Sequence, residues 1–379
     1  MYRSMHWNGA FASMLFLNNW EYTRNASFAK QYTYPLVSGL VSWWSCFLQR
    51  STSTNGSLLL NDWNQMDPDE SAENEPVHNP MTGLAFAKRL ANFQITLSKA
   101  LFPDQAAPPD ALEIVQHLAP FPLAPDTTKP VWSSWWNHTS GCCTPLYPIF
   151  PTELLSQASD EADLETARRS VKQYTGPTTT DLATKGLPVE AFPAAVRAGR
   201  SVSSGWQPHE VLEGLEKMLV LRKCCDSQML PVASGGGVEN VGVTRAVNEM
   251  LLVAPDGLYI EVFPFFPKDE PASFTTLRSK GGWLVSASQS ASGLVSDVQI
   301  EATVTDTCRF VDPWAINSSG SDRSEPAVTC TPTPTAQRVT HTSVGQRHGL
   351  LTWWMSAGQR CNVMARQVFA RPESGIVGG

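Results

Sequence analysis

The sequence has 379 residues, of which 42% are hydrophobic and 17% are charged, a balance typical of folded rather than disordered chains. A chain of this length can bury a sizeable core and form two domains. Its net charge of −7 argues against nucleic acid or an anionic membrane surface as the main partner. No apolar run is long enough to span a bilayer.

Helical spacing dominates the first two thirds of the chain. Bulky apolar residues predict a helix over residues 8–24, and a second helical stretch follows that Pro35 divides into a short and a longer piece. Pro80 suits the first position of another helix, with Asn79 as its cap. These two helical stretches are expected at residues 26–48 and 80–101, and further ones at 111–118, 161–174, 190–198, 209–221 and 241–252. A polar connection is expected at 175–188 and a long Pro- and Trp-rich loop at 120–151.

The pattern changes to strands near Pro255. β-Branched and aromatic residues predict strands at 258–263, 281–287, 295–304, 350–355 and 361–369. Residues 317–348 are rich in Ser, Thr and Pro and are expected to form a flexible insertion. The predicted fold is therefore mainly α with a C-terminal β domain. Residues 1–253 are expected to form a partial (α/α)6 barrel and residues 254–379 a small β-sandwich.

The most unusual stretch runs from Asn61 to Asn79, between two helical regions. It holds six carboxylates and no basic residue, and Pro68 and Pro76 make a long helix through it improbable. Carboxylates can protonate a leaving group, while amides and an indole can hold sugar hydroxyls and a ring face. A solvated acidic loop is the plainer interpretation, because runs of charge usually just face water.

Two glycosidase families resemble this stretch. Ser71-Ala72-Glu73-Asn74 is similar to the Ser-Pro-Glu-Asn loop of glycoside hydrolase family 95, the inverting α-L-fucosidase family, whose Glu is the general acid. Asp67-Pro68-Asp69-Glu70 resembles the Gly-Pro-Asp-Glu loop of family 65, whose Glu is the acid. The first resemblance implies Glu73 as the acid and the second implies Glu70. Later motifs favour family 95 and therefore Glu73.

The family 95 resemblance recurs in the same order along residues 6 to about 310. His6-Trp7-Asn8 resembles a His-x-Asn-x-Asn motif, although Ala10 replaces the second Asn. Thr144–Pro151 resembles a Ser-His-Leu-Tyr-x-x-x-Pro segment, without the family's preceding histidines. Gly237–Gly242 and Asn248–Leu252 resemble Ile-Asp-Gly-Asn-Phe-Gly and Ala-Glu-Met-Leu-Leu. Two further matches are Phe263–Pro267 and Leu277–Gly282. Because the chain opens almost on a motif, the resemblance implies an N-terminally truncated six-hairpin glycosidase.

The resemblance implies a two-carboxylate mechanism. Glu73 or Glu70 would be the general acid, and Glu239, reached only across a one-residue gap in the motif, would be the base. An inverting enzyme places these groups about 6.5–9.5 Å apart, with a water between the base and the sugar. Asn8 and Asn240 would orient that water, and Gly235–Gly237 would let the backbone approach the sugar. The other expected substrate-binding residues are His6, Trp7, Trp63, Asn64 and Asn74.

Several of these residues have simpler interpretations. Glu249 fits a structural role within a helix, and Trp43 and Trp44 fit the core better than a sugar-binding surface. Trp63 suits either role, and His6 could be a buried histidine with its hydrogen bonds satisfied.

Three readings of function follow. The first is an inverting glycoside hydrolase acting on an oligosaccharide or glycoconjugate, with no cofactor and no metal. The second is a phosphorylase like those of family 65, in which phosphate replaces the base; Glu239 argues against it. The third is an inactive carbohydrate-binding remnant.

The compartment is open from sequence alone. The N-terminus lacks the apolar core of a signal peptide. Four glycosylation sequons, at Asn25, Asn55, Asn137 and Asn317, are nevertheless compatible with a secreted or lumenal protein. The eight cysteines show no metal-ligand spacing. Cys308 and Cys330 are candidates for a disulfide, although pairing cannot be deduced from sequence.

Overall fold

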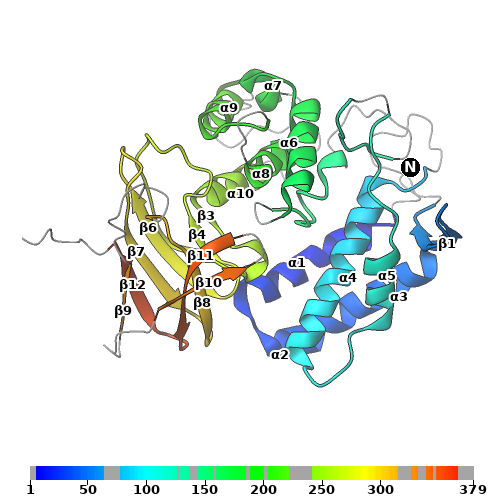
Figure 1. Cartoon of the computed structure of the whole chain (residues 1–379), viewed down its shortest axis with the longest axis horizontal. Coiled ribbons are helices and arrows are strands. Elements are labelled where there is room, and N and C mark those ends of the chain that lie inside the picture. The colour runs from blue at the N-terminus through cyan, green and yellow to red at the C-terminus, as the bar shows by residue number, and fades with distance from the viewer. Residues whose placement is uncertain are drawn as a thin grey trace, which may run out of the picture. The chain divides into compact units, whose positions relative to one another are not determined.

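The chain folds into a helical unit and a β unit. The structure, a computed structural model, describes residues 6–63, 77–125, 128–135, 144–156, 159–184, 188–199, 204–221, 241–314, 326–331, 339–344 and 347–365. The helical unit comprises residues 1–251 and 264–266, and the β unit comprises 252–263 and 267–379 (Figure 1). A mainly helical first part followed by a β part agrees with the sequence prediction.

The helical unit contains long helices where the apolar spacing predicted them. Its elements are α1 (Asn8–Thr23), α2 (Ala26–Phe28), the π-helix η1 (Ala29–Thr33), α3 (Tyr34–Phe47), β1 (Gln49–Thr52), β2 (Leu58–Asn61), α4 (Met81–Leu101), α5 (Pro109–His117), η2 (Thr144–Leu146), α6 (Glu161–Thr175), α7 (Thr179–Thr184), α8 (Pro188–Ala198), α9 (Pro208–Leu221) and α10 (Val241–Leu251). Residues 80–100 and 208–221, where strands would have contradicted the predicted fold, are helical apart from Pro80.

Three local predictions need correction. The polar connection at 175–188 contains the short helix α7, in which Asp181 accepts a hydrogen bond from the Thr178 backbone N–H and so caps the first turn. Residues 49–61 form an antiparallel hairpin that the helical pattern did not predict. Asn79 does not cap α4, which begins at Met81. Its side chain instead accepts a hydrogen bond from the Asp62 N–H and donates one to Asn61 Oδ1.

Pro35 is accommodated by a widened turn rather than a break. It lies in the first turn of α3, directly after the π-helical residues 29–33. A proline clashes with the carbonyl one turn earlier and donates no hydrogen bond, so a π turn immediately before it relieves both constraints. The predicted short and long pieces are therefore present, but they are continuous.

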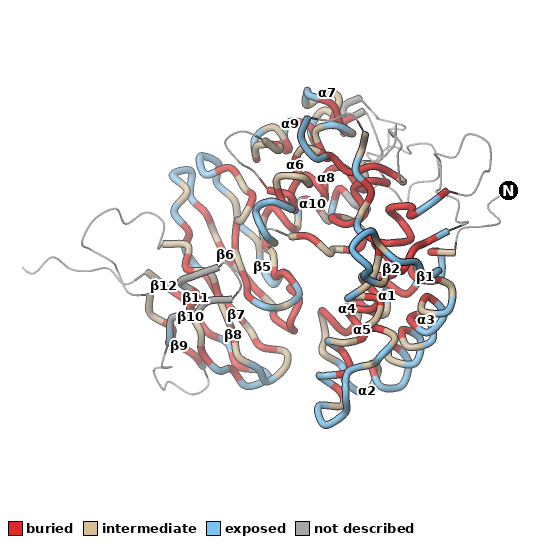
Figure 2. The backbone as a smooth tube through the Cα atoms, turned by 45° about the vertical axis from the view of Figure 1, so that its right-hand side comes forward, coloured by how far each residue is buried: buried red, intermediate tan, exposed pale blue. Residues whose placement is uncertain are grey.

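One continuous core holds the helical unit together. The inward faces of α1, α3 and α4 supply Leu17, Val41, Trp44, Phe86 and Leu90, all fully or almost fully buried. Along α3 the buried positions are 37, 41, 44 and 48, the spacing of one helix stripe. Figure 2 shows this pattern as buried segments on the inner sides of the helices, with exposed segments outside.

The β unit contains antiparallel sheets whose strands alternate between buried and exposed residues. Its elements are β3 (Leu252–Val253), η4 (Pro255–Gly257), β4 (Glu261–Val262), β5 (Ala272–Ser279), β6 (Trp283–Gln289), β7 (Val295–Ala302), β8 (Asp306–Val311), β9 (Ala327–Thr331), β10 (Thr340–Val344), β11 (Arg347–Met355) and β12 (Arg360–Met364). The described strands form a five-stranded sheet in the order β5-β6-β7-β12-β9, a three-stranded sheet in the order β10-β11-β8, and the pair β3-β4.

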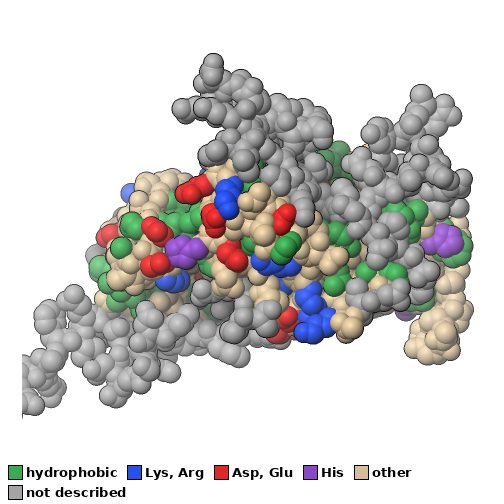
Figure 3. Space-filling model, turned by 90° about the horizontal axis from the view of Figure 1, so that it is seen from above, with side chains coloured by type: hydrophobic (Ala, Val, Ile, Leu, Met, Phe, Trp, Pro, Cys, Tyr) green, Lys and Arg blue, Asp and Glu red, His purple; other side chains and the backbone are tan. Residues whose placement is uncertain are grey.

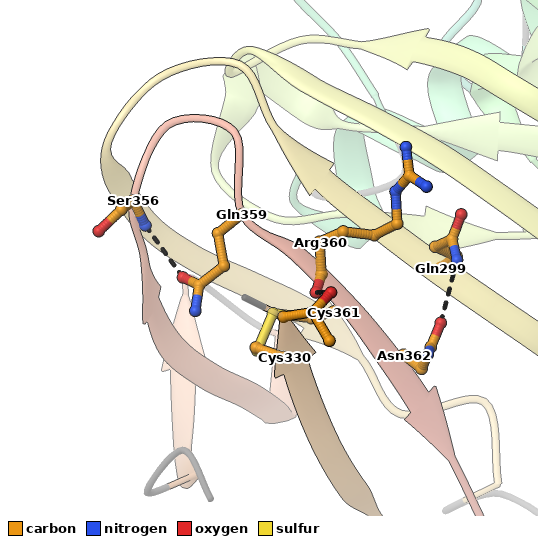
Figure 4. Close-up of a disulfide and its surroundings, with 8 residues drawn as sticks. Gln299, Cys330, Ser356, Gln359, Arg360, Cys361 and Asn362 are labelled. Atoms are coloured by element: carbon orange, nitrogen blue, oxygen red, sulfur yellow. Dashed lines mark hydrogen bonds between the residues drawn. A yellow bond between two sulfur atoms is a disulfide. The ribbon is translucent and has the colours of Figure 1, made fainter. Parts of the chain in front are cut away.

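The expected flexible insertion at 317–348 contains structure. β9 and β10 both fall within it, and β9 pairs with β12 at the edge of the larger sheet. Cys330 of β9 is bonded to Cys361, which lies directly opposite on β12 (Figure 4). The Cys308–Cys330 pairing considered from sequence is therefore wrong, and Cys308 is a buried free thiol. Composition indicated a linker here because Ser, Thr and Pro are common in loops. Thr also suits strands, and a disulfide can stabilise a strand that buries little apolar surface.

Charges on the described surface are mixed in sign. On the face shown in Figure 3, acidic and basic side chains lie interspersed rather than in separate blocks. For example, the exposed Arg50 guanidinium contacts Glu113 at 2.8 Å. No helix among the described residues is long and apolar enough to cross a membrane.

Candidate active site

The acidic segment is closed at its base by hydrogen bonds between its two ends. The Asn79 backbone N–H donates to the Asp62 carbonyl (2.7 Å), and the Asp62 N–H donates to Asn79 Oδ1 (2.8 Å). Asn79 Nδ2 also donates to Asn61 Oδ1 (3.1 Å). Asn79 has φ of 49°, a left-handed conformation that Asn tolerates better than most residues. These bonds fix where the segment leaves and rejoins the helical unit.

An aromatic pair stands immediately inside this closure. The rings of Trp63 and His78 lie 3.9 Å apart at an angle of 32°. Trp63 is 38% exposed and His78 is also exposed, so both side chains are accessible at the base of the acidic segment. An exposed indole beside hydrogen-bonding groups can stack against the apolar face of a sugar ring.

The start of α4 joins this base to the Pro- and Trp-rich segment. The Met81 N–H donates to the Ser134 carbonyl (2.7 Å), and the hydroxyls of Ser134 and Thr144 lie 2.7 Å apart. All three residues are buried. The two parts of the 120–151 segment that the structure describes on either side of residues 136–143 are therefore both held at the N-terminal end of α4.

The first motif of the chain packs against the same end of α4. The Trp7 ring stacks on Phe86 with a centroid distance of 5.8 Å and an angle of 5°, and Tyr147 meets both rings edge-on. Phe86 is five residues beyond Met81, which is about 7.5 Å along the helix axis at 1.5 Å per residue. Trp7 is only 8% exposed, so its ring supports the site from within the core, while Asn8, at the start of α1, is exposed.

His6 and Trp43 form a second aromatic surface. Trp43 stacks on Phe47 (4.7 Å, 12°), and the His6 ring lies 4.8 Å from Phe47 and 5.8 Å from Trp43. Partial burial lowers the pKa of His6 below its ordinary value, so the imidazole is neutral at pH 7 and can both donate and accept a hydrogen bond. Trp43 is 40% exposed, whereas Trp44 is 1% exposed.

Sequence reasoning placed both tryptophans of α3 in the core, which is correct for Trp44 and wrong for Trp43. The helical stripe of buried positions already separates them, because Trp44 lies on the 37–41–44–48 line and Trp43 lies about 100° away from it. That spacing was the available signal for an exposed aromatic residue.

A buried ionic network connects the Asn248–Leu252 motif to the Thr144–Pro151 motif. Glu249 of α10 accepts hydrogen bonds from Arg197 Nε (2.6 Å) and Nη2 (2.5 Å) and contacts Arg245 Nε. Glu153 contacts the same two guanidiniums at 2.8 and 2.9 Å. Burial by itself would raise the pKa of Glu249, but the charges of Arg197 and Arg245 hold it below its ordinary value. The structural role predicted for Glu249 is confirmed.

The network also reaches the Thr144–Pro151 motif. Arg197 Nη1 donates to the Ile149 carbonyl (3.3 Å), and the Arg197 guanidinium lies 5.6 Å from the centroid of the Phe150 ring. Glu153 follows two residues after that motif. Through Arg245 and Glu249, α10 is thereby connected to the segment that contacts Trp7 and α4.

The predicted catalytic residues themselves lie outside the described residues. Glu70, Glu73, Asn64 and Asn74 fall within 64–76, and Glu239 and Asn240 fall within 222–240. Among the described candidates, Trp63 and His78 contact each other beside the closure of the acidic segment, Trp7 packs on Phe86 of α4, and His6 lies against Trp43 and Phe47 of α3. No group of three potential metal ligands occurs among the residues that the structure describes.

Comparisons with known proteins find a weak structural similarity but no match in sequence. No protein-family model matches the sequence, and no curated protein matches it. Among solved structures, the Streptomyces avermitilis α-L-rhamnosidase complexed with L-rhamnose, a glycoside hydrolase, is weakly similar, with a TM-score of 0.35 and 12% sequence identity. The match covers 94% of this chain but only 32% of the rhamnosidase chain.

Proposed function

We propose that this protein is an inverting glycoside hydrolase, or the part of one that carries its acid and base. The supporting observation is the closure of the acidic segment by Asp62 and Asn79 at the N-terminal end of α4, beside exposed aromatic rings. The acidic sequence of residues 64–76 begins and ends at these bonded positions, next to aromatic rings suited to a sugar. The helices are proposed to belong to a partial (α/α)6 barrel within residues 1–253, with a β-sandwich in residues 254–379.

The roles proposed for the carboxylates follow from the chemistry of inversion. Glu73, or Glu70 in its place, would donate a proton to the glycosidic oxygen as its bond to the anomeric carbon breaks. Glu239 would remove a proton from the water that attacks the opposite face of the ring. Asn8 and Asn240 would hold that water, and Trp63 would contact the sugar ring.

The described geometry supports a common position for the two loops. Asn8 lies next to Trp7, which packs on α4 near the base of the acidic segment. Glu239 lies two residues before α10, which the Arg197 network ties to the segment around Ile149. The contacts that support this are those of Trp7 with Tyr147 and of Arg197 with Ile149, both within the Thr144–Pro151 region. On this basis the two carboxylate-bearing loops are proposed to share one end of the helices.

Separate Glu→Gln variants in the acidic loop test the proposal. On glycosides with poor leaving groups, Glu73→Gln is expected to reduce kcat about 100-fold or more, because general acid catalysis contributes that much. On a dinitrophenyl glycoside the loss should be much smaller, since that leaving group needs no proton. Glu75→Gln, in the same loop and without an assigned role, is the matched control.

Other outcomes would favour one of the alternative hypotheses. Loss of turnover in Glu70→Gln with near-normal turnover in Glu73→Gln would assign the acid to Glu70. Full activity in both variants would remove the loop from the mechanism. Turnover that depends on added phosphate would favour the phosphorylase reading. Oligosaccharide binding without any turnover by the unaltered chain would favour the inactive binding remnant.

A further inference from the structure

The hairpin of the helical unit carries a sequon at its tip. β1 and β2 are joined by residues 53–57, and Asn55-Gly56-Ser57 occupies the turn. The Ser53 N–H donates to the Ser57 carbonyl (2.8 Å), and the Gly56 N–H donates to the Ser53 carbonyl (2.9 Å). Gly56 has φ of 85°, which glycine adopts without strain. The turn is thus specified by five consecutive residues.

The Asn55 carboxamide is arranged for reaction at its nitrogen. Its Oδ1 accepts hydrogen bonds from the Ser57 backbone N–H (3.2 Å) and from the Ser53 hydroxyl. Donors on the oxygen withdraw electron density and make the Nδ2 protons easier to remove. Among the described hydrogen bonds Nδ2 donates in none, and residues 53–57 are exposed or half-exposed. A Cβ built on the neighbouring Gly56 would meet nothing within 4 Å, so the tip has open space beside it.

The hydrogen bonds that shape the turn are local, within the loop that joins the paired strands β1 and β2. Every bond described above joins residues 53–57 to one another. Such a local Asn-based turn can form in a chain that has not finished folding. The sequon can therefore take its reactive conformation when an enzyme meets the nascent chain.

The other described sequon is arranged differently. Asn25 is exposed, but its Oδ1 accepts from the Phe28 N–H as the N-cap of α2, and Ser27 lies within that helix. Its conformation therefore depends on helix formation and not on its own Ser. This makes Asn55 the better substrate of the two.

An independent feature of the β unit fits the compartment in which such a modification occurs. Cys330 and Cys361, 31 residues apart, are bonded across neighbouring strands, and both are buried. Disulfides of this structural kind form and persist in oxidising compartments. N-glycosylation of Asn-x-Ser takes place in the same compartments in eukaryotic cells, at exposed loops.

We propose that Asn55 is an N-glycosylation site. In the reaction Asn55 Nδ2 forms a bond to the anomeric carbon of a polyprenyl diphosphate-linked oligosaccharide. The bond from that carbon to the diphosphate oxygen breaks, the polyprenyl diphosphate leaves with the electron pair, and one Nδ2 proton is lost to a base on the transferase. The product is a glycan on the hairpin tip.

The test is site mapping in the full chain. The protein is directed into the secretory pathway of a eukaryotic host and recovered from the medium or the cells. It is then treated with an amidase that releases N-glycans in heavy-oxygen water. A peptide containing position 55 with the mass of an oxygen-labelled aspartate is expected. Asn55→Gln and Ser57→Ala should abolish that label, and Ser57→Thr should retain it. Asn25→Gln is the matched control and should leave the label at position 55 unchanged.

An unlabelled peptide at position 55 in the folded chain from this pathway would overturn the proposal. So would a label that persists in Ser57→Ala, because it would show deamidation rather than release of a glycan.

Discussion

The buried network around Glu249 gives the most direct test of how the helical unit is held together. Glu249→Gln keeps the shape of the side chain and removes its charge. Arg197 and Arg245 would then share the single carboxylate of Glu153, which leaves one buried positive charge uncompensated. Breaking a buried pair by removing one partner costs about 3–5 kcal/mol, a large part of the roughly 5–15 kcal/mol that stabilises an ordinary domain.

The assay is urea unfolding followed by far-UV circular dichroism at pH 7. Helical ellipticity reports mainly on the helical unit, which matters because two units need not unfold together. Glu113→Gln, which breaks the exposed pair with Arg50, is the control and should leave the unfolding midpoint almost unchanged. Equal midpoints for Glu249→Gln and Glu113→Gln would refute the argument that the buried charges stabilise the fold.

The difference in unfolding free energy between the unaltered chain and Glu249→Gln should depend on pH in one direction. The pKa of Glu249 is below its ordinary value of 4.5 in the folded protein, so its ionised form stabilises the fold above about pH 4.5. That contribution is lost as the pH falls through the lowered folded pKa. The difference in unfolding free energy between the unaltered chain and Glu249→Gln should therefore narrow below pH 4.5, and should not change between pH 6 and 8.

The remaining predictions concern single side chains. Trp44→Ala should cost about 3–5 kcal/mol in the same unfolding assay because it empties a core site, whereas Trp43→Ala should cost far less and instead weaken oligosaccharide binding in calorimetry. Asn79→Ala should be less stable than Asn79→Gly, because both lose the side-chain bonds but only alanine is strained at φ of 49°. Burial raises the pKa of the Cys308 thiol, so peptide mapping after alkylation of the native protein at pH 8 should find Cys46 modified and Cys308 protected.

Helical periodicity was sufficient to predict most of the helical unit. The apolar stripe of α3 buries one face against the common core, as its sequence spacing indicates. In α1 the bulky Phe11 and Leu15 are exposed and the buried line runs through Ala10, Met14 and Leu17, while the first half of α4 is buried on all sides. The spacing could not predict the hairpin of β1 and β2, whose strands are four residues each and too short to show alternation. It also could not reveal that Asn79 bonds to residues 61 and 62 instead of capping α4, because that choice depends on a tertiary contact.

The sequence pattern failed to predict strands β9 and β10 for a related reason. Ser, Thr and Pro dominate the region, and composition alone does not distinguish a linker from edge strands whose pairing is set by distant residues. Cys330 could be paired with Cys361 only once β9 and β12 were known to be neighbours. The candidate site divides in the same way. Motif order indicated which segments matter, but whether Trp7 supports the site from the core or faces a sugar depends on its contact with Phe86.

The central proposal is inverting hydrolysis, and the configuration of the first-formed sugar tests it most directly. Proton NMR recorded during turnover of an oligosaccharide or aryl glycoside by the full chain distinguishes the two anomers before they equilibrate. The account predicts that the free sugar appears first with the configuration opposite to that of the substrate, in buffer without phosphate. First appearance of the retained anomer would contradict it, because retention requires a covalent intermediate and carboxylates only about 5–5.5 Å apart.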